Sequence, residues 1–145
     1  MATIRDILAI KGSRVAFTEL HATAYEAAAQ MSRDKIGSLL VLDQGRLAGI
    51  VTERDILSRV VAQHRDADLT RVAEVMTAEL VCGRLHTSIE EARLVMKDRR
   101  IRHLPVVDDN DELLGLVSIG DLNAFEASSH EQTIYLLREY ITGRV

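Results

Sequence analysis

The sequence lacks the features that mark several common classes of protein. No uninterrupted apolar run is longer than Leu39–Leu42, far short of the ~20 residues of a membrane-spanning helix. The N-terminus carries an acidic residue within its apolar pattern and has no long apolar core, which argues against a signal peptide. Cys82 is the single cysteine, so no internal disulfide can form, as is usual in a reducing cytoplasm. We therefore expect a cytoplasmic protein without a membrane partner.

Positive charge is not in excess either. The formal net charge is -4, whereas a nucleic-acid-binding domain normally has a basic face. A few local cations are still enough for a small anionic ligand. With 145 residues, of which 47% are hydrophobic and 28% charged, the chain has the composition of an ordinary globular domain with a core of useful size. We expect no nucleic-acid partner.

An internal duplication organises the chain. Leu20–Met31 (LHATAYEAAAQM) matches Leu85–Met96 (LHTSIEEARLVM), and Ile36–Asp43 (IGSLLVLD) matches Ile101–Asp108 (IRHLPVVD). After one inserted residue in the second copy, LAGIVTERDIL aligns with LLGLVSIGDLN. Both copies therefore contain the same heptad: a glycine, two apolar residues, a Ser or Thr, two free positions and an Asp.

The same order of elements is predicted for both copies. Each begins with a short apolar stretch, Val15–Phe17 or Leu80–Cys82, that we predict to be a strand. A capped helix with one apolar stripe follows, then two short β-rich runs, then a helix that begins at Thr52 or Ser118. We predict an α+β fold of two β-α-β-β-α units. The stripes are Ala24, Ala27, Met31 and Ile89, Ala92, Met96; the capping boxes are Thr23-x-x-Glu26 and Ser88-x-x-Glu91; and the β-rich runs are Leu39–Leu42, Leu47–Val51, Leu104–Val107 and Leu113–Val117.

The duplication also sets the expected domain boundaries. We expect repeats at residues 4–61 and 72–127, joined by a polar linker at 62–71. A C-terminal helix at 128–145 is predicted from the capping pattern Ser128-x-x-Glu131 and the apolar residues after it. Its apolar face is wider than a single stripe, so it requires cover from the core or from a second subunit.

The two heptads, GIVTERD (Gly49–Asp55) and GLVSIGD (Gly115–Asp121), have two interpretations. In the structural one, the hydroxyl and the carboxylate form a capping box, and the glycine lets a neighbouring backbone approach the strand. In the functional one, free amides at the helix start and the hydroxyl contact a phosphate. The aspartate then accepts hydrogen bonds from both hydroxyls of a ribose, as acidic residues do in dinucleotide folds. The residues alone leave both interpretations open.

The whole repeat unit, through GIVTERD, GLVSIGD and IRHLPVVD, resembles a tandem pair of CBS domains, also called a Bateman module. The resemblance covers nearly the entire chain. It implies two repeats related by pseudo-twofold symmetry, with adenine-nucleotide sites in the clefts between them. The implied ligand is AMP, ADP, ATP or NAD, with S-adenosylmethionine less favoured, and no catalytic cofactor is implied. A homodimer in the form of a four-repeat disc and an effector protein of unknown identity are also implied.

The resemblance assigns roles to individual residues. Asp55 and Asp121 would hold ribose hydroxyls, while Thr52 and Ser118 would contact ribose or phosphate. Arg102 and His103 match positions that often meet phosphate, and Thr77 matches one that often lies near the base. The remaining candidate nucleotide-binding residues are Arg54, Ile36, Ser38 and Pro105.

The two copies differ where phosphate contacts are expected. The first copy has Gly37 and Ser38 where the second has the cationic pair Arg102 and His103. A site on the first copy would therefore use another cation, for which the candidates are Lys35, Lys11 and Arg14, or prefer a ligand with less phosphate charge. We expect two non-equivalent sites that both accept adenosine but differ in affinity or in ligand.

Neither catalysis nor metal binding is predicted. The sequence shows no nucleophile, base and orienting residue in a recognised arrangement. None of the five histidines is spaced i, i+4 from another ligand on a helix, so no metal site is expected. Two functions remain: a sensor that binds adenine nucleotides and signals to a partner, or a protein-interaction scaffold without a functional nucleotide site.

Overall fold

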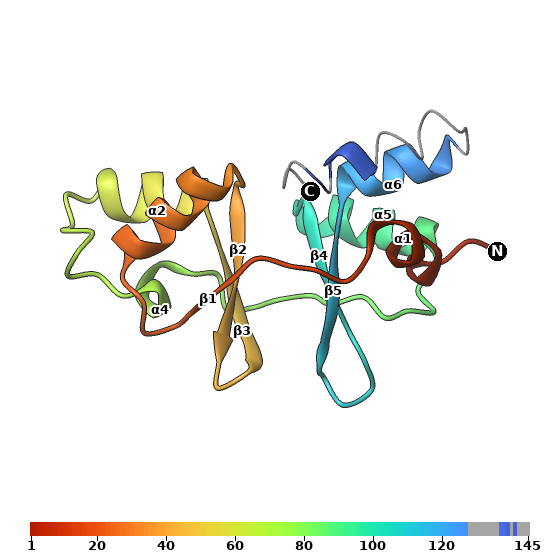
Figure 1. The fold of residues 1–145 in the computed structure, drawn as a ribbon, viewed down its shortest axis with the longest axis horizontal. Helices are drawn as coiled ribbons and strands as arrows, with labels where there is room; N and C mark the ends of the chain where they lie inside the picture. The colour runs from red at the N-terminus through yellow and green to blue at the C-terminus, as the bar shows by residue number, and fades with distance from the viewer. Residues whose placement is uncertain (128–136, 140, 142–145) are drawn as a thin grey trace. The chain divides into compact units, whose positions relative to one another are not determined.

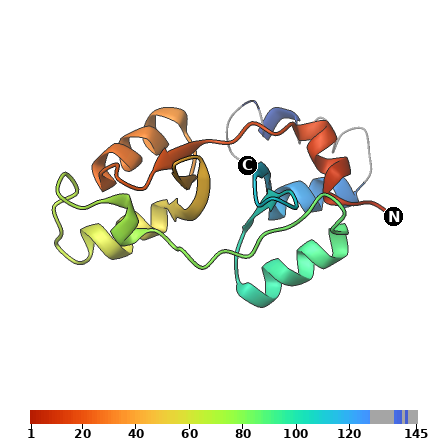
Figure 2. The same cartoon turned by 90° about the horizontal axis from the view of Figure 1, so that it is seen from below.

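The computed structural model describes residues 1–127, 137–139 and 141, and the chain divides into two compact units. We call Val15–Leu80 the Asp55 unit, and Met1–Arg14 together with Val81–Val145 the Asp121 unit. Each unit contains one small β-sheet with helices packed against it (Figures 1 and 2). The fold is α+β with two repeats, as predicted.

The Asp55 unit is built on a three-stranded sheet in the order β1-β2-β3. β1 (Phe17–Glu19) runs parallel to β2 (Ser38–Asp43), which pairs antiparallel with β3 (Arg46–Thr52). Helix α2 connects β1 to β2 and packs against the sheet, with the short α4 beside it. After β3 the chain enters α3 and continues directly into the π-helical segment η1. These helical elements are α2 (Ala24–Asp34), α3 (Glu53–Ile56), η1 (Leu57–Val61) and α4 (Val72–Val75).

The Asp121 unit is built on the antiparallel hairpin of β4 (His103–Val107) and β5 (Leu113–Ser118). Three helices contact this hairpin or one another: α1 (Ile4–Lys11), α5 (Ile89–Arg99) and α6 (Ile119–Glu126). In Figures 1 and 2 the red helix α1 lies among the green α5 and the blue α6, although it is the first helix of the chain. The buried core of the unit consists of Ile4, Ile7, Ile89, Ala92, Met96, Leu104, Val106, Val117 and Leu122.

The helix that opens each copy packs in the unit of the other copy. α1 precedes the first copy but buries Ile4 and Ile7 in the core of the Asp121 unit. α4 opens the second copy but buries Val72 and Val75 in the Asp55 unit. Matching backbone hydrogen bonds hold the two helices: Ile4 N to Thr87 O (2.9 Å) and Arg5 N to Leu85 O (3.1 Å), and Val72 N to Ala22 O (2.8 Å) and Ala73 N to Leu20 O (3.0 Å).

Because of this exchange, the two compact units do not coincide with the repeats expected at residues 4–61 and 72–127. The polar stretch 62–71 lies between η1 and α4 within the Asp55 unit, because α4 returns to pack against α2. The chain passes from one unit to the other at Arg14–Val15 and at Leu80–Val81. The helix expected at 128–145 lies for the most part outside the described residues; residues 137–139 and 141 are helical.

Most of the predicted elements are confirmed. β2, β3, β4 and β5 contain the four β-rich runs, and the apolar stripes of α2 and α5 are buried. Both predicted capping boxes are formed, with Glu26 N 3.0 Å from Thr23 Oγ1 and Glu91 N 3.0 Å from Ser88 Oγ.

The first strand of each copy was predicted less well. The strand expected at Val15–Phe17 begins only at Phe17 and continues to Glu19. The prediction of a strand at Leu80–Cys82 is wrong. At the corresponding place in the second copy, an isolated parallel bridge joins Gly83 to Val106. Val81 packs against the core of the Asp121 unit, which accounts for the apolar pattern without a strand.

Candidate functional site

Two equivalent strand-to-helix junctions carry the residues that the sequence singled out. At the Asp55 junction β3 ends at Thr52 and α3 begins, and at the Asp121 junction β5 ends at Ser118 and α6 begins (Figure 1). Sheet register places Ser38 opposite Thr52, and His103 opposite Ser118. The candidate residues divide between the units: Ile36, Ser38, Thr52, Arg54, Asp55 and Thr77 in the Asp55 unit, and Arg102, His103, Pro105, Ser118 and Asp121 in the Asp121 unit.

Both junctions form the predicted capping boxes. Asp55 Oδ2 accepts a hydrogen bond from Thr52 N at 2.9 Å, and Asp55 N donates to Thr52 Oγ1 at 3.2 Å. In the second copy Asp121 Oδ2 accepts from Ser118 N at 2.8 Å, and Asp121 N donates to Ser118 Oγ at 3.1 Å. The capping part of the structural interpretation is therefore confirmed for both heptads, and each capping box holds its carboxylate in a defined orientation. At Gly115 the close neighbour is the Leu8 side chain and not the expected backbone.

Two of the amides at the start of each helix donate hydrogen bonds within the fold. The first amide of α3, Glu53 N, donates to Gly37 O at 3.0 Å, and the first amide of α6, Ile119 N, donates to Arg102 O at 2.9 Å. The third amide of each helix donates to the capping hydroxyl. For these first and third amides, the expectation that they are free for a phosphate is therefore wrong. Recognition of a ligand at either junction depends mainly on side chains.

At the Asp55 junction one carboxylate oxygen lies outside the capping box. Asp55 Oδ1 is 3.9 Å from Arg59 Nε, and 49% of the Arg59 side chain is exposed. Arg59 Nη1 donates to Val75 O and to Met76 O, both at 3.0 Å, and so connects the junction helix to the end of α4. Sequence reasoning missed Arg59, although its i, i+4 spacing from Asp55 on one helix predicts an ion pair.

Gly49 allows Thr77 to approach the Asp55 junction. Thr77 and Ile50 exchange two backbone hydrogen bonds, of 2.8 and 3.0 Å, along β3. A Cβ atom on Gly49 would lie 2.6 Å from Thr77 O, a distance that no ordinary side chain tolerates. The predicted close approach of a backbone at this glycine is confirmed, and the approaching segment carries one of the candidate residues.

At the Asp121 junction the carboxylate is buried and paired with a lysine. Lys11 Nζ lies 2.7 Å from Asp121 Oδ2, and the two side chains are 3% and 0% exposed. Lys11 Nζ also donates to Leu116 O at 2.7 Å. Burial lowers the pKa of Lys11, and the charge of Asp121 opposes that shift. Lys11 was a candidate cation for the first copy, and this expectation is wrong because α1 packs in the Asp121 unit.

Arg102 and His103 differ in exposure and in charge. Arg102 is exposed, whereas His103 is half-buried in β4. Burial lowers the pKa of His103, and the nearby Lys11 ammonium lowers it further, with Asp121 acting in the opposite direction. His103 is therefore neutral near neutral pH. The expected cationic pair contains one permanent cation, Arg102.

The remaining candidate nucleotide-binding residues differ in their exposure to solvent. Arg54 is exposed, Ile36 is half-buried and Ser38 is buried. Pro105 is buried within β4, and its carbonyl accepts a hydrogen bond from Gly83 N at 2.8 Å, so it serves the packing of the sheet. The substitute cations Lys35 and Arg14 are both exposed.

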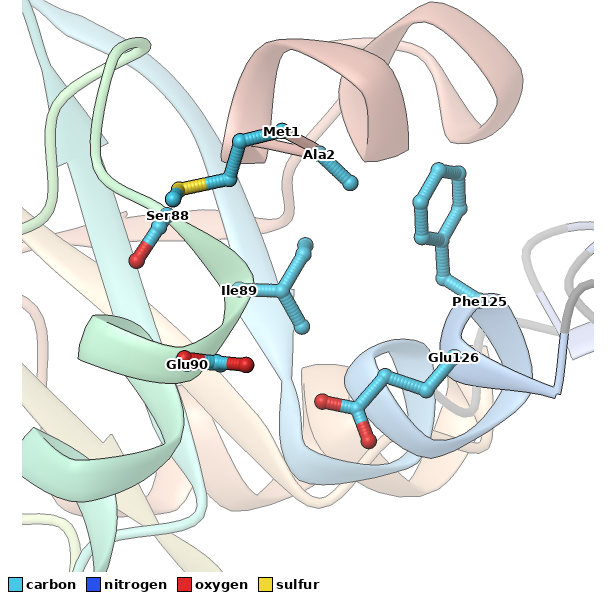
Figure 3. Close-up of a pocket in the computed structure, with 7 residues that line it drawn as sticks. All are labelled: Met1, Ala2, Ser88, Ile89, Glu90, Phe125 and Glu126. Carbon is cyan, nitrogen blue, oxygen red and sulfur yellow. The ribbon is translucent and has the colours of Figure 1, made fainter.

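A pocket of about 300 Å³ lies apart from the junctions, within the Asp121 unit. Figure 3 shows Ile89 of α5 and Phe125 of α6 on opposite sides of this space, near the N-terminal residues. The candidate nucleotide-binding residues do not line it. The lining residues are Met1, Ala2, Ser88, Ile89, Glu90, Phe125 and Glu126.

Metal ligands and membrane spans were sought in the part of the chain that the structure describes. There, no three His, Cys, Asp or Glu side chains gather closely enough to hold a metal ion. Within the same residues, no helix combines the length and the apolar character needed to span a bilayer.

Comparison with known proteins relates both repeats to one family. The CBS domain family model matches residues 4–62 and 72–127. The CBS domain-containing protein YhcV of Bacillus subtilis is 40% identical over 129 residues, which cover 89% of each chain. The crystal structure of the CBS domain NE2398 has 35% sequence identity and a TM-score of 0.81, and covers 89% of this chain and 100% of that one.

Two further solved structures contain ligands. The CBS domain pair of MJ0100, in complex with 5′-methylthioadenosine and S-adenosyl-L-methionine, is 25% identical with a TM-score of 0.73, covering 88% of this chain and 98% of that one. The cytosolic domain of the Mg²⁺ channel MgtE, in complex with ATP, is 30% identical with a TM-score of 0.65, covering 77% of this chain and 44% of that one. Since the family match extends over both repeats and the fold agrees, this chain belongs to the CBS domain family.

Proposed function

We propose that this chain is a regulatory module that senses adenine nucleotides (AMP, ADP, ATP or NAD) and performs no catalysis of its own. The observation that carries the proposal is the Asp55 carboxylate. Its Oδ2 is held by Thr52, while Oδ1 lies outside the capping box beside the partly exposed Arg59. A carboxylate held in this way is suited to accept hydrogen bonds from the two hydroxyls of a ribose.

The ligands of the related structures support this choice. 5′-Methylthioadenosine, S-adenosyl-L-methionine and ATP, which MJ0100 and MgtE bind, all contain adenine joined to a ribose with free 2′- and 3′-hydroxyls. At the Asp55 junction we assign the ribose to Asp55 and Thr52, and the base to the segment around Thr77. Arg54 and Lys35, both exposed in the same unit, are the cations that we assign to phosphate.

Signalling in this proposal is a shift between conformations. A nucleotide favours one conformation only if it binds that conformation more tightly than the alternative. The change is read by an effector protein or by a second copy of the chain, in the cytoplasm. Leu57 and Val61 are 63% and 61% exposed and lie four residues apart on the helix formed by α3 and η1. We assign this apolar face to the homodimer that the family resemblance implies.

Calorimetry and thermal unfolding with AMP, ADP, ATP and NAD test the proposal. A ligand that binds only the folded state stabilises it by about 2.7 kcal/mol at 100 times its Kd, so Tm should rise with nucleotide concentration. Asp55→Asn should remove both the heat of binding and the rise in Tm. Asp43→Asn, the same change at the exposed end of β2, should preserve both. An Asp55→Asn protein that binds like the wild type would refute the ribose assignment.

The completed capping boxes favour a second candidate function. They account for the hydroxyl and the carboxylate of both heptads without any ligand. In that case the chain is an interaction scaffold without a functional nucleotide site. A scaffold would show no rise in Tm with any of the four nucleotides, so the same titration separates the two functions.

A further inference from the structure

The two junctions use different donors for equivalent backbone carbonyls. In the Asp55 unit Ile50 O accepts a hydrogen bond from Thr77 N at 2.8 Å. At the equivalent position of the repeat, Leu116 O accepts from Lys11 Nζ at 2.7 Å. The lengths of the exchanged helices explain the difference. α4 ends at Val75 and the chain becomes extended at Met76, whereas α1 continues for another turn and carries Lys11 to the junction.

The same lysine neutralises the Asp121 carboxylate, and the two aspartates therefore have very different surroundings. The Asp121 side chain is 0% exposed and lies 2.7 Å from a lysine that is 3% exposed. The Asp55 side chain is 12% exposed, and its cationic neighbour Arg59 is 49% exposed and 3.9 Å away. Arg59 can shift toward solvent when a ligand arrives, because about half of its side chain is already exposed. Lys11 has no such route.

The second oxygen of Asp121 does not change this conclusion. Asp121 Oδ1 is buried and accepts no hydrogen bond from the described residues. It is an acceptor without a donor, but a ribose hydroxyl reaches it only if Lys11 and the chain around it give way. Displacing Lys11 would leave an ammonium group buried without its partner, which is strongly unfavourable.

We propose that Lys11 closes the Asp121 junction to ribose, so that each chain binds a single nucleotide, at the Asp55 junction. This inference rests on the proposed function and deepens it, because it names the residue that decides which of the two repeated heptads is used. It replaces the expectation of two adenosine sites of different affinity. In this role Lys11 determines which of the two junctions binds nucleotide, without contacting the ligand itself.

Titration of uniformly ¹⁵N-labelled wild-type protein with AMP tests the inference without any substitution. Calorimetry should give one equivalent of AMP per chain. The amide signals of Thr52 to Asp55 should shift, and those of Ser118 to Asp121 should stay in place. Two equivalents, with shifts at both junctions, would overturn the role of Lys11 and leave the proposed function standing. Shifts at neither junction and no heat of binding, when the titration is repeated with ADP, ATP and NAD, would overturn the proposed function itself, and this inference with it.

A variant that removes the lysine charge gives the second test. Lys11→Gln should open the Asp121 junction and add a second equivalent of AMP, and the further change Asp121→Asn should remove that equivalent again. Arg5→Gln removes a charge from an exposed position of the same helix, α1, and should leave one equivalent. A folded Lys11→Gln protein that still binds one equivalent would overturn the inference. If Lys11→Gln fails to fold, the wild-type titration decides the question.

Discussion

Lys11 and Asp121 are 110 residues apart in the sequence, and their charged atoms are 2.7 Å apart in the fold. The exposed ion pairs of the chain, such as Arg33 with Asp34, are of a kind that contributes little to stability. A buried pair behaves differently, because removing one partner leaves an uncompensated charge without water. The pair therefore affects both the stability of the Asp121 unit and its capacity to bind a ligand.

Lys11→Met should reduce the free energy of unfolding by about 3–5 kcal/mol, since it leaves the Asp121 carboxylate buried without a cation. Replacing both partners, as Lys11→Met with Asp121→Leu, should recover much of that loss, because no charge is then buried. Urea unfolding followed by circular dichroism measures both values. Lys97→Met, at an exposed position of α5, is the matched control. A Lys11→Met protein as stable as this control would contradict the account of a buried pair.

Gly49→Ala should destabilise the Asp55 unit by about 1–3 kcal/mol, the usual cost of forcing an extra methyl group into a packed region. The new methyl would meet Thr77 O at 2.6 Å and Met76 Sδ at 2.8 Å. At Gly37 the nearest atom to a new methyl is Glu53 Cδ at 3.5 Å, an ordinary contact. Gly37→Ala should therefore change stability by less than about 0.5 kcal/mol. Equal effects of the two substitutions in urea unfolding would show that the close approach to Thr77 is unimportant.

His103 should make the folded protein less stable in mild acid. Its pKa in the folded state is lowered from 6.5, by burial first, then by Lys11 and Arg102, against the opposing effect of Asp121. The unfolded chain therefore takes up this proton first as the pH falls. The stabilising contribution is complete above the unfolded pKa and is lost as the pH falls through the lowered, folded pKa. His103→Gln should flatten this part of the pH dependence.

Urea unfolding of the wild type and His103→Gln, compared between about pH 7.5 and 5, where histidines titrate, measures this effect. His86→Gln, which removes an exposed histidine of the same unit, should retain the wild-type profile. If His103→Gln loses stability as steeply as the wild type over this range, the burial of His103 does not control its protonation.

Leu57→Glu should weaken the proposed homodimer by at least about tenfold, equal to ~1.4 kcal/mol, because it places a charge in an apolar contact. Sedimentation across a range of protein concentrations measures the change. Leu69→Glu alters a leucine that is even more exposed, at 79%, outside the helix of α3 and η1, and should leave association unchanged. Identical sedimentation of the two variants would exclude this helix face from the interface.

Local patterns predicted the elements well because neighbouring residues form them. The capping boxes at Thr23, Thr52, Ser88 and Ser118 need only a hydroxyl and an acid three residues later, and all four are formed. The duplication also predicted equivalent geometry in both copies. The β-bulge after Val41 recurs after Val106, the matching residue of the second copy. Lys35 and Arg100, which follow matching helices, both adopt the left-handed conformation.

Contacts between distant parts of the chain were not predictable in the same way. A short apolar stretch such as Leu80–Cys82 has the same sequence pattern whether it pairs in a sheet or only packs against the core. The pattern therefore could not show that no strand forms here. The first amides of α3 and α6, which were expected to be free, donate to Gly37 O and Arg102 O, which lie directly before β2 and β4. Each of these outcomes depends on which distant segments of the chain pack against one another.

By itself, the sequence determined the duplication, strands β2 to β5, the capped helices α2 and α5, the capping boxes and the family, because these follow from patterns within each copy. Only the tertiary structure decided that α1 packs in the Asp121 unit and that Lys11 pairs with Asp121 while Asp55 keeps an exposed cation beside it. The physical reason is that burial and ion pairing depend on distance in space, and two copies of one motif acquire different chemistry when different segments pack against them.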